Sequence, residues 1–333
     1  MSSLVVKVAL VDEVNLHPNA DLLELAIVGG WQCVVPKGKF RAGDRVVYFA
    51  PDTMLPLDVS ERFGVTQYLS KGRVHSVKLR GEPSMGLVVV PDSPDWPVDE
   101  DVAGYYGATK YEPPVKFTAG DAESPHPLFM GYTSIENMRH FPGVFQPWEF
   151  VVVTEKVHGT NCRVGMVGGV LMGGSHQIRR KEPENCATSM YWFPLSLEPV
   201  QNLVSALGAL HSQVILYGEV YGMGVQSYDY GQSGKAFAAF DLMIDGKYVD
   251  HDVFLDHCRK FGVPTVPELG RIPFDLAEVK LFSRGKAFSG KHIREGVVVK
   301  PLMERTDPKV GRVILKFISD DYMLGCKEDF SDV

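Results

Sequence analysis

Residues 154–161 read Thr-Glu-Lys-Val-His-Gly-Thr-Asn, and three valines, Val151–Val153, precede them. The valines favour a β-strand, so Lys156 is predicted to lie where a strand meets a glycine-containing turn. A lysine packed against apolar chain loses hydration, which lowers the pKa of its amine and makes it a nucleophile. Glycine permits close approach of a bulky ligand, and Thr160 and Asn161 can hydrogen-bond to sugar or phosphate. Taken alone, the stretch also fits a strand end with an exposed lysine, which is the commoner arrangement.

Four further motifs follow in order along the chain. They are Tyr-Gly-Glu-Val-Tyr-Gly at 217–222, Phe-Asp-Leu-Met at 240–243, Arg-Glu-Gly-Val-Val-Val-Lys at 294–300 and Val-Ile-Leu-Lys at 313–316. With the first stretch they resemble motifs I, III, IIIa, IV and V of the covalent nucleotidyltransferases, which comprise RNA ligases, DNA ligases and mRNA capping enzymes. The form Lys-x-His-Gly-Thr-Asn resembles ATP-dependent RNA ligases rather than the Lys-x-Asp-Gly of the other classes. Because five motifs occur in order, the resemblance is specific, and it covers residues 133–319.

This resemblance implies a role for each motif. Lys156 would capture AMP, Glu219 and Glu295 would serve catalysis and hold a divalent metal ion, and Lys316 would face the α-phosphate. It also implies cofactor-binding residues. The backbone of Glu155 and Val157 would frame the adenine, Phe240 would stack on it, and Asn161 would touch the ribose or the strand end. Lys300 is the remaining cofactor-binding residue.

Residue chemistry alone leaves a structural alternative at each position. An acid such as Glu219 commonly flanks a turn, and an aromatic such as Phe240 commonly packs in the core. Charges at the ends of a valine-rich strand, such as Glu295 and Lys300, can prevent an edge strand from pairing with another chain. A strand lysine such as Lys316 can extend its amine to solvent. The order of the motifs favours the functional interpretation.

The last motif departs from the family pattern. Many RNA ligases carry two lysines there as Lys-x-Lys, whereas this chain has Ile314 and Ile318 on either side of Lys316. Which group assists Lys316 is therefore open.

A basic stretch at 173–181 falls where the family places a side chain that meets phosphate. The register is open, so His176, Arg179 and Arg180 are all candidates for substrate binding. A solvated basic turn is an equal alternative.

Composition sets broad limits on the function. The 333 residues, 45% of them hydrophobic and 23% charged, suit a globular protein of two domains. A net charge of −7 argues against a protein that coats nucleic acid through bulk charge, although a local basic groove is compatible with it. No apolar run of about 18 residues and no signal-peptide pattern occurs, so no membrane span or export is expected. The five scattered cysteines favour a reducing, cytoplasmic location.

Strand and turn patterns predict an α+β protein. Short β segments at 4–11, 22–28, 32–36, 45–49, 73–79 and 87–90, separated by turns, favour a small OB-like β-barrel. Later segments predict short helices at 133–139, 202–210 and 253–261 and a hairpin across Gly168-Gly169. We expect an OB-like domain with an appendage over 1–115, a linker over 116–130, and an adenylyltransferase domain of the DNA/RNA ligase (ATP-grasp-like) type, with antiparallel sheets and flanking helices, over 131–333.

The expected activity is ATP-dependent joining of 3′-hydroxyl and 5′-phosphate RNA ends in RNA repair. It would proceed through lysyl-AMP and a 5′-adenylylated strand, with Mg²⁺ or Mn²⁺. Capping enzymes and DNA ligases carry an OB domain after the last motif, whereas here only 320–333 follow, and the N-terminal barrel resembles the Naegleria-type clade of RNA ligases. The expected partner is RNA, with RNA/DNA hybrid ends open, and we expect a monomer. A capping-type guanylyltransferase and a non-catalytic RNA-binding protein of the same fold are the alternatives.

Overall fold

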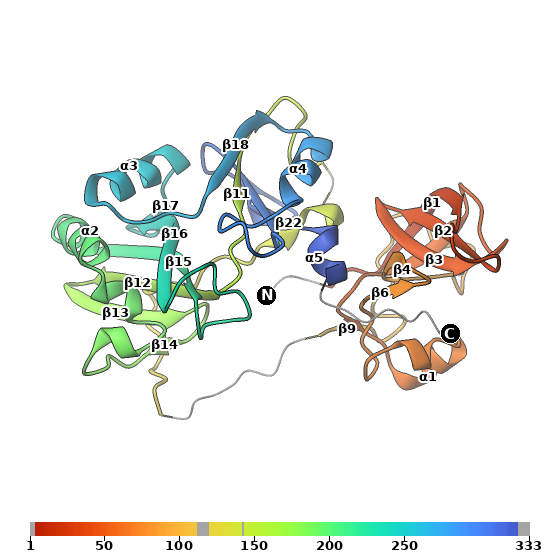
Figure 1. Cartoon of the computed structure of the whole chain (residues 1–333), viewed down its shortest axis with the longest axis horizontal. Coiled ribbons are helices and arrows are strands. Elements are labelled where there is room, and N and C mark those ends of the chain that lie inside the picture. Colours follow the sequence, from red (N-terminus) through yellow and green to blue (C-terminus); the bar gives the residue numbers. More distant parts are fainter. Residues whose placement is uncertain (1–3, 112–119, 142, 326–333) are drawn as a thin grey trace. The chain divides into compact units, whose positions relative to one another are not determined.

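The chain forms two compact units in the computed structural model, which describes residues 4–111, 120–141 and 143–325 (Figure 1). The N-terminal unit comprises Met1–Val115 and Met323–Val333, and the larger unit comprises Lys116–Tyr322. None of the described helices has the length and apolar character that a membrane span requires.

An antiparallel five-stranded sheet, in the order β3-β2-β1-β4-β8, forms the N-terminal unit. Its strands are β1 (Lys7–Leu16), β2 (Leu23–Val28), β3 (Trp31–Pro36), β4 (Arg45–Phe49) and β8 (Leu87–Val89). Its edge strand β3 meets β7 (Glu82–Met85), where the Val34 N–H donates to Ser84 Oγ (3.0 Å), so the sheet is a nearly closed barrel. The predicted OB-like barrel is therefore confirmed.

Both faces of this sheet are covered. Along β4, Val46 and Tyr48 belong to one apolar core, while Val47 and Phe49 belong to another. Tyr106 packs in the second core, which explains why β4 reads as a continuous apolar run rather than an alternating one. The remaining elements of this unit are β5 (Thr53–Met54), β9 (Thr109–Lys110), β6 (Ser76–Leu79), α1 (Leu57–Arg62) and the 3-10 turn η1 (Thr66–Tyr68). Of the residues of α5 (Asp320–Gly325), those from Met323 onward are assigned to this unit.

Two large sheets form most of the larger unit, of which the first has the strand order β10-β22-β19-β11-β18. Its strands are β10 (Glu136–Asn137), β11 (Phe150–Glu155), β18 (Glu268–Pro273), β19 (Gly296–Pro301) and β22 (Leu315–Ile318). Buried valines of β11 and β19, such as Val153 and Val299, pack with Val279 of α4 (Leu276–Ser283). The short hairpin of β20 (Thr306–Asp307) and β21 (Gly311–Arg312) leads from β19 towards β22.

The second sheet has six strands in the order β14-β13-β12-β15-β16-β17. They are β12 (Thr160–Val167), β13 (Val170–Ser175), β14 (Arg179–Arg180), β15 (Gln213–Gly222), β16 (Lys235–Ile244) and β17 (Lys247–Tyr248). The predicted hairpin is confirmed, because β12 and β13 pair directly across Gly168 and Gly169, whose φ angles are 56° and 80°. Two successive positive φ angles are what a tight two-residue hairpin turn requires.

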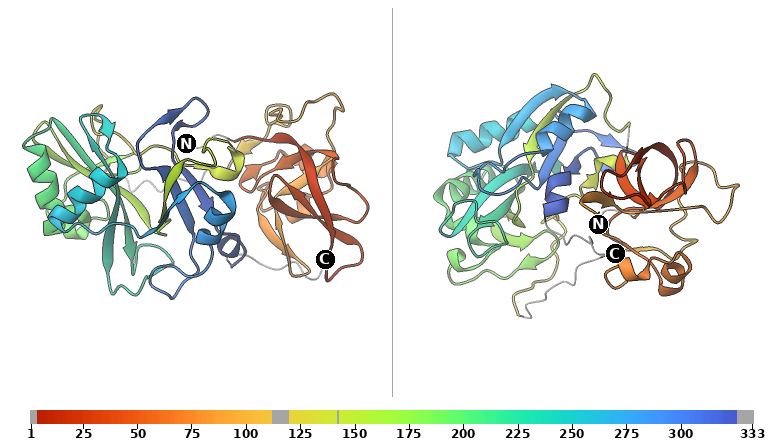
Figure 2. Two further views of the ribbon diagram at one scale, coloured as in Figure 1. Left: turned by 90° about the horizontal axis from the view of Figure 1, so that it is seen from above. Right: turned by 45° about the vertical axis from the view of Figure 1, so that its right-hand side comes forward.

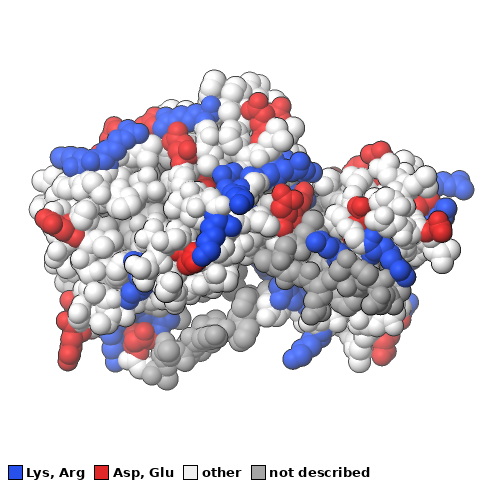
Figure 3. All heavy atoms as spheres, in the orientation of Figure 1, with Lys and Arg blue, Asp and Glu red and all other residues white. Residues whose placement is uncertain are grey.

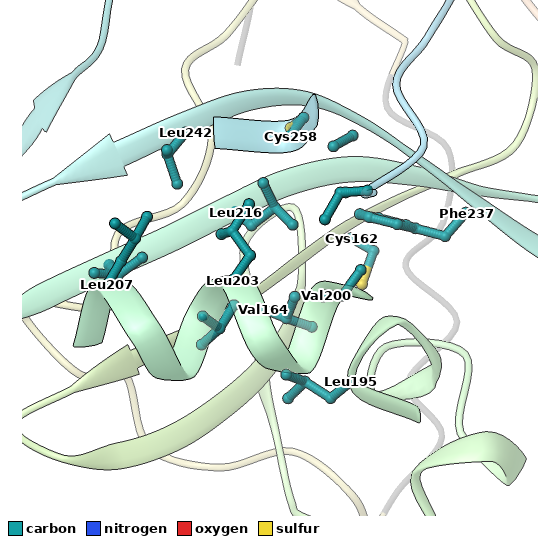
Figure 4. Packing of buried hydrophobic residues seen from close by; sticks show 14 of the residues in the cluster. Cys162, Val164, Leu195, Val200, Leu203, Leu207, Leu216, Phe237, Leu242 and Cys258 are labelled. Carbon is teal, nitrogen blue, oxygen red and sulfur yellow. The ribbon is translucent and has the colours of Figure 1, made fainter. Parts of the chain in front are cut away.

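Two helices, α2 (Glu198–Gly208) and α3 (His251–Phe261), cover one face of the six-stranded sheet (Figure 2). In this core Leu203 and Leu207 of α2 pack with Leu216 of β15 and Leu242 of β16 (Figure 4). The predicted end of α3 is confirmed: Gly262 follows it in the left-handed conformation, with φ +75°. The 3-10 turns of this unit are η2 (Met138–His140), η3 (Cys186–Thr188) and η4 (Phe193–Ser196).

Residues 133–139 differ from the predicted short helix. Glu136 and Asn137 form β10, which pairs in parallel with β22, and Asn137 then caps the turn η2 by accepting from the Arg139 N–H (3.1 Å). A helix of so few residues has little stability of its own, so pairing with a buried strand overrides it. Within the range predicted as a linker, residues 120–130 pack on the larger unit, where Phe129 is buried.

Candidate active site

Lys156 lies directly after β11, as the sequence predicts. Its backbone N–H donates to Gly296 O at the start of β19 (2.9 Å), which fixes the turn against the five-stranded sheet. The Nζ atom donates to Glu295 Oε1 at 2.5 Å, and the side chain keeps 28% of its surface exposed. The other oxygen of Glu295 lies 3.1 Å from His158 Nδ1. The lysine is therefore paired and still reachable.

One pocket of the larger unit is lined by residues from both of its large sheets. Nine of the residues singled out from the sequence line it: Glu155, Lys156, Val157, Asn161, His176, Glu219, Phe240, Lys300 and Lys316. Glu295 is joined to this group by its hydrogen bond to Lys156. Residues that lie as far apart in sequence as motifs I and V thus share one cavity.

Gly159 sets how closely the turn after Lys156 approaches the six-stranded sheet. A Cβ atom at Gly159 would lie 2.3 Å from the backbone oxygen of Val220, a contact that no side-chain movement relieves, and 2.9 Å from Glu219 Cγ. The sequence suggested that this glycine makes room for a ligand. The structure corrects that interpretation, because the space is taken by strand β15, and the glycine brings Lys156 and Glu219 together.

Phe240 enters the pocket through an irregularity in strand pairing. Tyr217 pairs with Asp241 but the next residue, Gly218, pairs with Ala239, so Phe240 is an extra residue in β16. Such a bulge re-aims a side chain and is common beside active sites. The Phe240 ring meets Tyr132 edge-on, with ring centroids 4.8 Å apart.

Three charges interact at the centre of the pocket. Burial alone would lower the pKa of Lys156, but Glu295 and Glu219 outweigh it, and the pKa is raised above its ordinary value. The lowered pKa expected from the sequence is therefore wrong for this arrangement. Burial raises the pKa of Glu219 to about 8 despite the charge of Lys156. Burial would also raise the pKa of Glu295, but Lys156 and His158 hold it below its ordinary value.

A buried ionic network supports the wall of the pocket behind Phe240. Asp241 is fully buried; its Oδ1 accepts from Lys300 (3.0 Å), and its Oδ2 accepts from the Tyr132 hydroxyl (2.7 Å) and pairs with Arg312 (2.7 Å). Burial alone would raise the pKa of Asp241, but Arg312 and Lys300 hold it low. Arg312 also pairs with Glu304 (2.5 Å). Sequence reasoning missed Tyr132, Arg312 and Glu304. One signal could have pointed to them: Asp241 follows Phe240 in an apolar motif, and a buried aspartate requires cationic partners.

This network also shows how Lys300 is used. Only about 4% of the residue is exposed, and its amine is held by Asp241 beneath the pocket. Lys300 therefore contributes to the lining of the pocket while its charge balances a buried carboxylate.

The three basic candidates of the 173–181 stretch separate in the structure. His176 lines the pocket, and burial lowers its pKa, which favours the neutral ring. Arg179 pairs with Glu123 (2.8 Å), and the buried Arg180 pairs with Asp121 (2.5 Å). Of the three, only His176 is brought to the other site residues.

Lys316 lines the pocket from β22, and Ile314 lines it two residues earlier. Of the two isoleucines on either side of Lys316, Ile314 is the one that lines the pocket. If Lys316 were the second lysine of a Lys-x-Lys pattern, position 314 would carry an amine, whereas here it is apolar.

Glu155 has a different environment from the one expected. Its backbone N–H donates to Pro267 O (2.9 Å), and its side chain is fully buried, accepting hydrogen bonds from the Phe288 N–H (3.1 Å) and Arg294 Nε (3.2 Å). The Glu155 carboxylate thus organises the segment before β19. Val157 is buried next to Tyr221 and Val266.

Two features of the pocket fit a nucleotide with a metal ion. Asn161 Oδ1 is buried and accepts no hydrogen bond from the described protein atoms. Buried acceptors usually have a donor, and a ligand hydroxyl could supply one here. Glu219 and Glu295 interact electrostatically beside Lys156. Nowhere among the described residues do three His, Cys, Asp or Glu side chains gather to hold a metal by themselves. Mg²⁺ keeps several waters and takes one or two carboxylates beside substrate phosphates, so the pair fits such an ion.

Comparison with known families assigns both parts of the chain. The RNA ligase family model matches residues 149–318, and a model of an OB-fold domain matches residues 5–91. Among curated proteins, none matches the chain.

Solved structures of Naegleria gruberi RNA ligase share the fold over nearly the whole chain. A lysine-to-alanine variant of that enzyme with ATP and Mn superposes with a TM-score of 0.79 at 23% identity, covering 97% of this chain and 98% of the other. The same enzyme with PPi gives a TM-score of 0.78 at 23% identity and the same coverage. A lysine-to-methionine variant with AMP and Mn gives 0.78 at 23% identity, covering 96% of this chain and 97% of the other.

Proposed function

This chain belongs to the RNA ligase family, and from that premise we propose that it is an ATP-dependent RNA ligase that joins 3′-hydroxyl and 5′-phosphate ends. The single observation that carries the proposal is the meeting of Lys156, Glu219 and Lys316 in one pocket, with Glu295 bonded to the lysine. This set offers a nucleophile, two acids and a cation on the two sides of one cavity.

The first step transfers AMP to the enzyme. Lys156 Nζ attacks the α-phosphorus of ATP, the bond to the departing pyrophosphate breaks, and a lysyl-N–AMP phosphoramidate forms. The amine must lose a proton to attack, and Glu295 Oε1, 2.5 Å away, is placed to accept it. Lys316 would balance the negative charge that moves onto the leaving group.

Two further transfers complete the reaction. The 5′-phosphate of an RNA strand attacks the lysyl-AMP, which frees the amine and gives a 5′–5′ pyrophosphate end. A 3′-hydroxyl then attacks the 5′-phosphorus of that end, AMP leaves, and a phosphodiester remains. Positioning of the ends supplies most of the acceleration in such in-line displacements.

The nucleotide would be held by side chains from both sheets. Phe240 would stack on the adenine, which the backbone of Glu155 and Val157 would frame, and Asn161 Oδ1 would accept from a ribose hydroxyl. Neutral His176 would face phosphate or sugar. Glu219 and Glu295 would hold Mg²⁺ or Mn²⁺ partly through water, and this ion would offset the repulsion among the phosphates. Solved structures of variants of the Naegleria enzyme hold AMP and Mn or ATP and Mn, which is consistent with this assignment.

Radiolabelled ATP with Mg²⁺ or Mn²⁺ tests the proposal. We expect an acid-labile, alkali-resistant AMP adduct on Lys156, absent in Lys156→Ala, which should nevertheless seal a strand that is already adenylylated. Unchanged labelling of Lys156→Ala contradicts the assignment. Labelling from GTP alone would indicate a capping-type guanylyltransferase, and no labelling from either nucleotide would indicate an RNA-binding protein.

Further properties follow as parts of the proposal. The substrate would be RNA, with RNA/DNA hybrid ends distinguished by sealing nicked duplexes that carry RNA or DNA on each side. We propose a monomer that works in RNA repair in the cytoplasm, a reducing compartment in which its cysteines would stay as thiols. The domain limits proposed are 1–115, 116–130 and 131–333.

A further inference from the structure

The segment 284–294 reads Arg-Gly-Lys-Ala-Phe-Ser-Gly-Lys-His-Ile-Arg and joins α4 to β19. It contains four lysines and arginines and no acidic residue, in a chain whose net charge is −7. We refer to residues 284–294 as the basic hairpin. Charge of one sign concentrated in so short a segment indicates an anionic partner.

The segment folds back on itself. Lys286 and Ile293 form an antiparallel bridge, and the Ala287 N–H donates to His292 O (2.9 Å). Gly290, with φ +72°, lies in the turn. The cationic side chains of Arg284, Lys286 and Lys291 are exposed.

Glu155 anchors the basic hairpin beside the nucleophile. One oxygen of this fully buried carboxylate accepts from the Phe288 N–H, and the other accepts from Arg294 Nε. Arg294 also donates to Phe282 O (2.5 Å) at the foot of the hairpin. Because Glu155 directly precedes Lys156, the hairpin is fixed next to the residue that would carry AMP.

Aromatic rings tie the basic hairpin to the turn that follows Lys156. Phe288 stacks on Tyr230, with ring centroids 4.9 Å apart and planes at 18°, and the Tyr230 hydroxyl accepts from the His158 N–H (2.7 Å). His292 stacks on Tyr228 at 4.2 Å. Phe288 still exposes 42% of its surface.

The charges of the basic hairpin are not used by the nucleotide pocket, since none of its residues lines that cavity. Three of them are exposed on a hairpin that Glu155 ties to the turn carrying Lys156, and a strand end must arrive at Lys156 to take its AMP. Lys and Arg side chains also gather in a short band on the face of the larger unit shown in Figure 3. Exposed cations with an exposed aromatic ring are the combination that binds an RNA strand, through phosphates and base stacking.

Building on the ligase function proposed above, we propose that the basic hairpin binds the phosphodiester backbone of the RNA next to its 5′-phosphate end. Arg284 and Lys286 would contact phosphates, and Phe288 would offer its free edge to a base. Lys291 is paired with Asp229 (2.5 Å), so it contributes less to phosphate binding.

The test is the double variant Arg284→Ala/Lys286→Ala. We expect its affinity for a fluorescent 5′-phosphorylated RNA oligonucleotide, measured by anisotropy, to fall on the order of tenfold at low salt. The slope of log K against log salt should decrease in magnitude by about 1.4, which corresponds to two lost contacts with a single strand. Labelling of Lys156 with AMP should be unchanged, since the pocket is untouched.

The control is Arg259→Ala/Lys260→Ala, which removes the same charge from the exposed end of α3. Equal losses of RNA affinity in the two variants, or no loss in the hairpin variant, would overturn the proposal. Loss of AMP labelling in the hairpin variant would also overturn it, because the hairpin would then serve the nucleotide step. Absence of AMP labelling in the wild-type protein would instead count against the ligase function, and the binding measurement still decides the role of the hairpin.

Discussion

At the residue scale, the chemistry proposed for Lys156 meets an electrostatic obstacle. The amine attacks only when it is uncharged, yet Glu295 and Glu219 stabilise its charged form and raise its pKa. Sequence reasoning considered only burial, which acts in the opposite direction. The two acids come from segments about 60 and 140 residues away, so their effect on the lysine could not be read from the motif itself.

We predict that Glu295→Gln lowers the pKa of Lys156. Removing a carboxylate 2.5 Å from the amine removes a stabilisation of the protonated form, so the uncharged amine appears at lower pH. The measurement is the acylation of Lys156 across pH, followed by mass spectrometry, without nucleotide or metal. The midpoint for the wild-type protein should lie above the ordinary lysine value of 10.5, and that of the variant should lie below the wild-type midpoint.

The matched control is Glu149→Gln, which changes a carboxylate paired with Arg305 elsewhere in the larger unit. It should leave the Lys156 midpoint in place. The electrostatic account of the site fails if the midpoint is the same in wild-type protein and Glu295→Gln.

At the element scale, the pocket depends on one bulge and the ionic network beneath it. The extra residue in β16 turns Phe240 towards the pocket and leaves Asp241 facing Lys300 and Arg312. Lys300 comes from β19 and Arg312 from β21, so Asp241 links both sheets of the larger unit. The network therefore determines the shape of the proposed adenine site.

We predict that Asp241→Asn destabilises the larger unit by about 3–5 kcal/mol, because it removes the fully buried carboxylate that pairs with Lys300 and Arg312 and leaves these two buried cations only Glu304. Denaturant unfolding followed by tryptophan fluorescence measures the change. The control Asp245→Asn makes the same substitution just after β16, where the carboxylate is 47% exposed and pairs with His211. That change should cost at most about 1 kcal/mol. Similar losses in both variants would show that the buried network contributes little.

Local patterns predicted some elements and missed others for a physical reason. The strand before Lys156, the hairpin at Gly168-Gly169 and the end of α3 at Gly262 depend on residues close in sequence, and the structure confirms them. The bulge at Phe240 depends on pairing with β15, and the strand β10 depends on pairing with β22. Neither partner can be identified from local sequence, so the helix predicted at 133–139 was wrong.

At the scale of the whole molecule, the order of the motifs predicted the ligase fold of the larger unit, and the short β segments predicted the OB-like barrel of the other. Motif order reflects which strands line one cavity, so it carries information about contacts between distant residues. It does not carry the charges and hydrogen bonds that complete the site. The basic hairpin illustrates this limit, because its cations are visible in the sequence but its anchor, Glu155, lies 129 positions before Arg284.

The division into two units yields a last prediction, which concerns a chain shortened to residues 116–333, that is, the larger unit with the C-terminal segment that follows it. Every residue that lines the pocket lies within the larger unit, and this unit has its own apolar cores. We therefore expect the shortened chain to fold and to form the AMP adduct on Lys156, while sealing of RNA ends falls because the OB-like barrel is missing. Circular dichroism checks folding, and labelled ATP and a sealing assay separate the steps. A folded shortened chain that forms no adduct would mean that the N-terminal unit takes part in the first transfer, and unimpaired sealing would mean that the barrel is not needed to engage RNA.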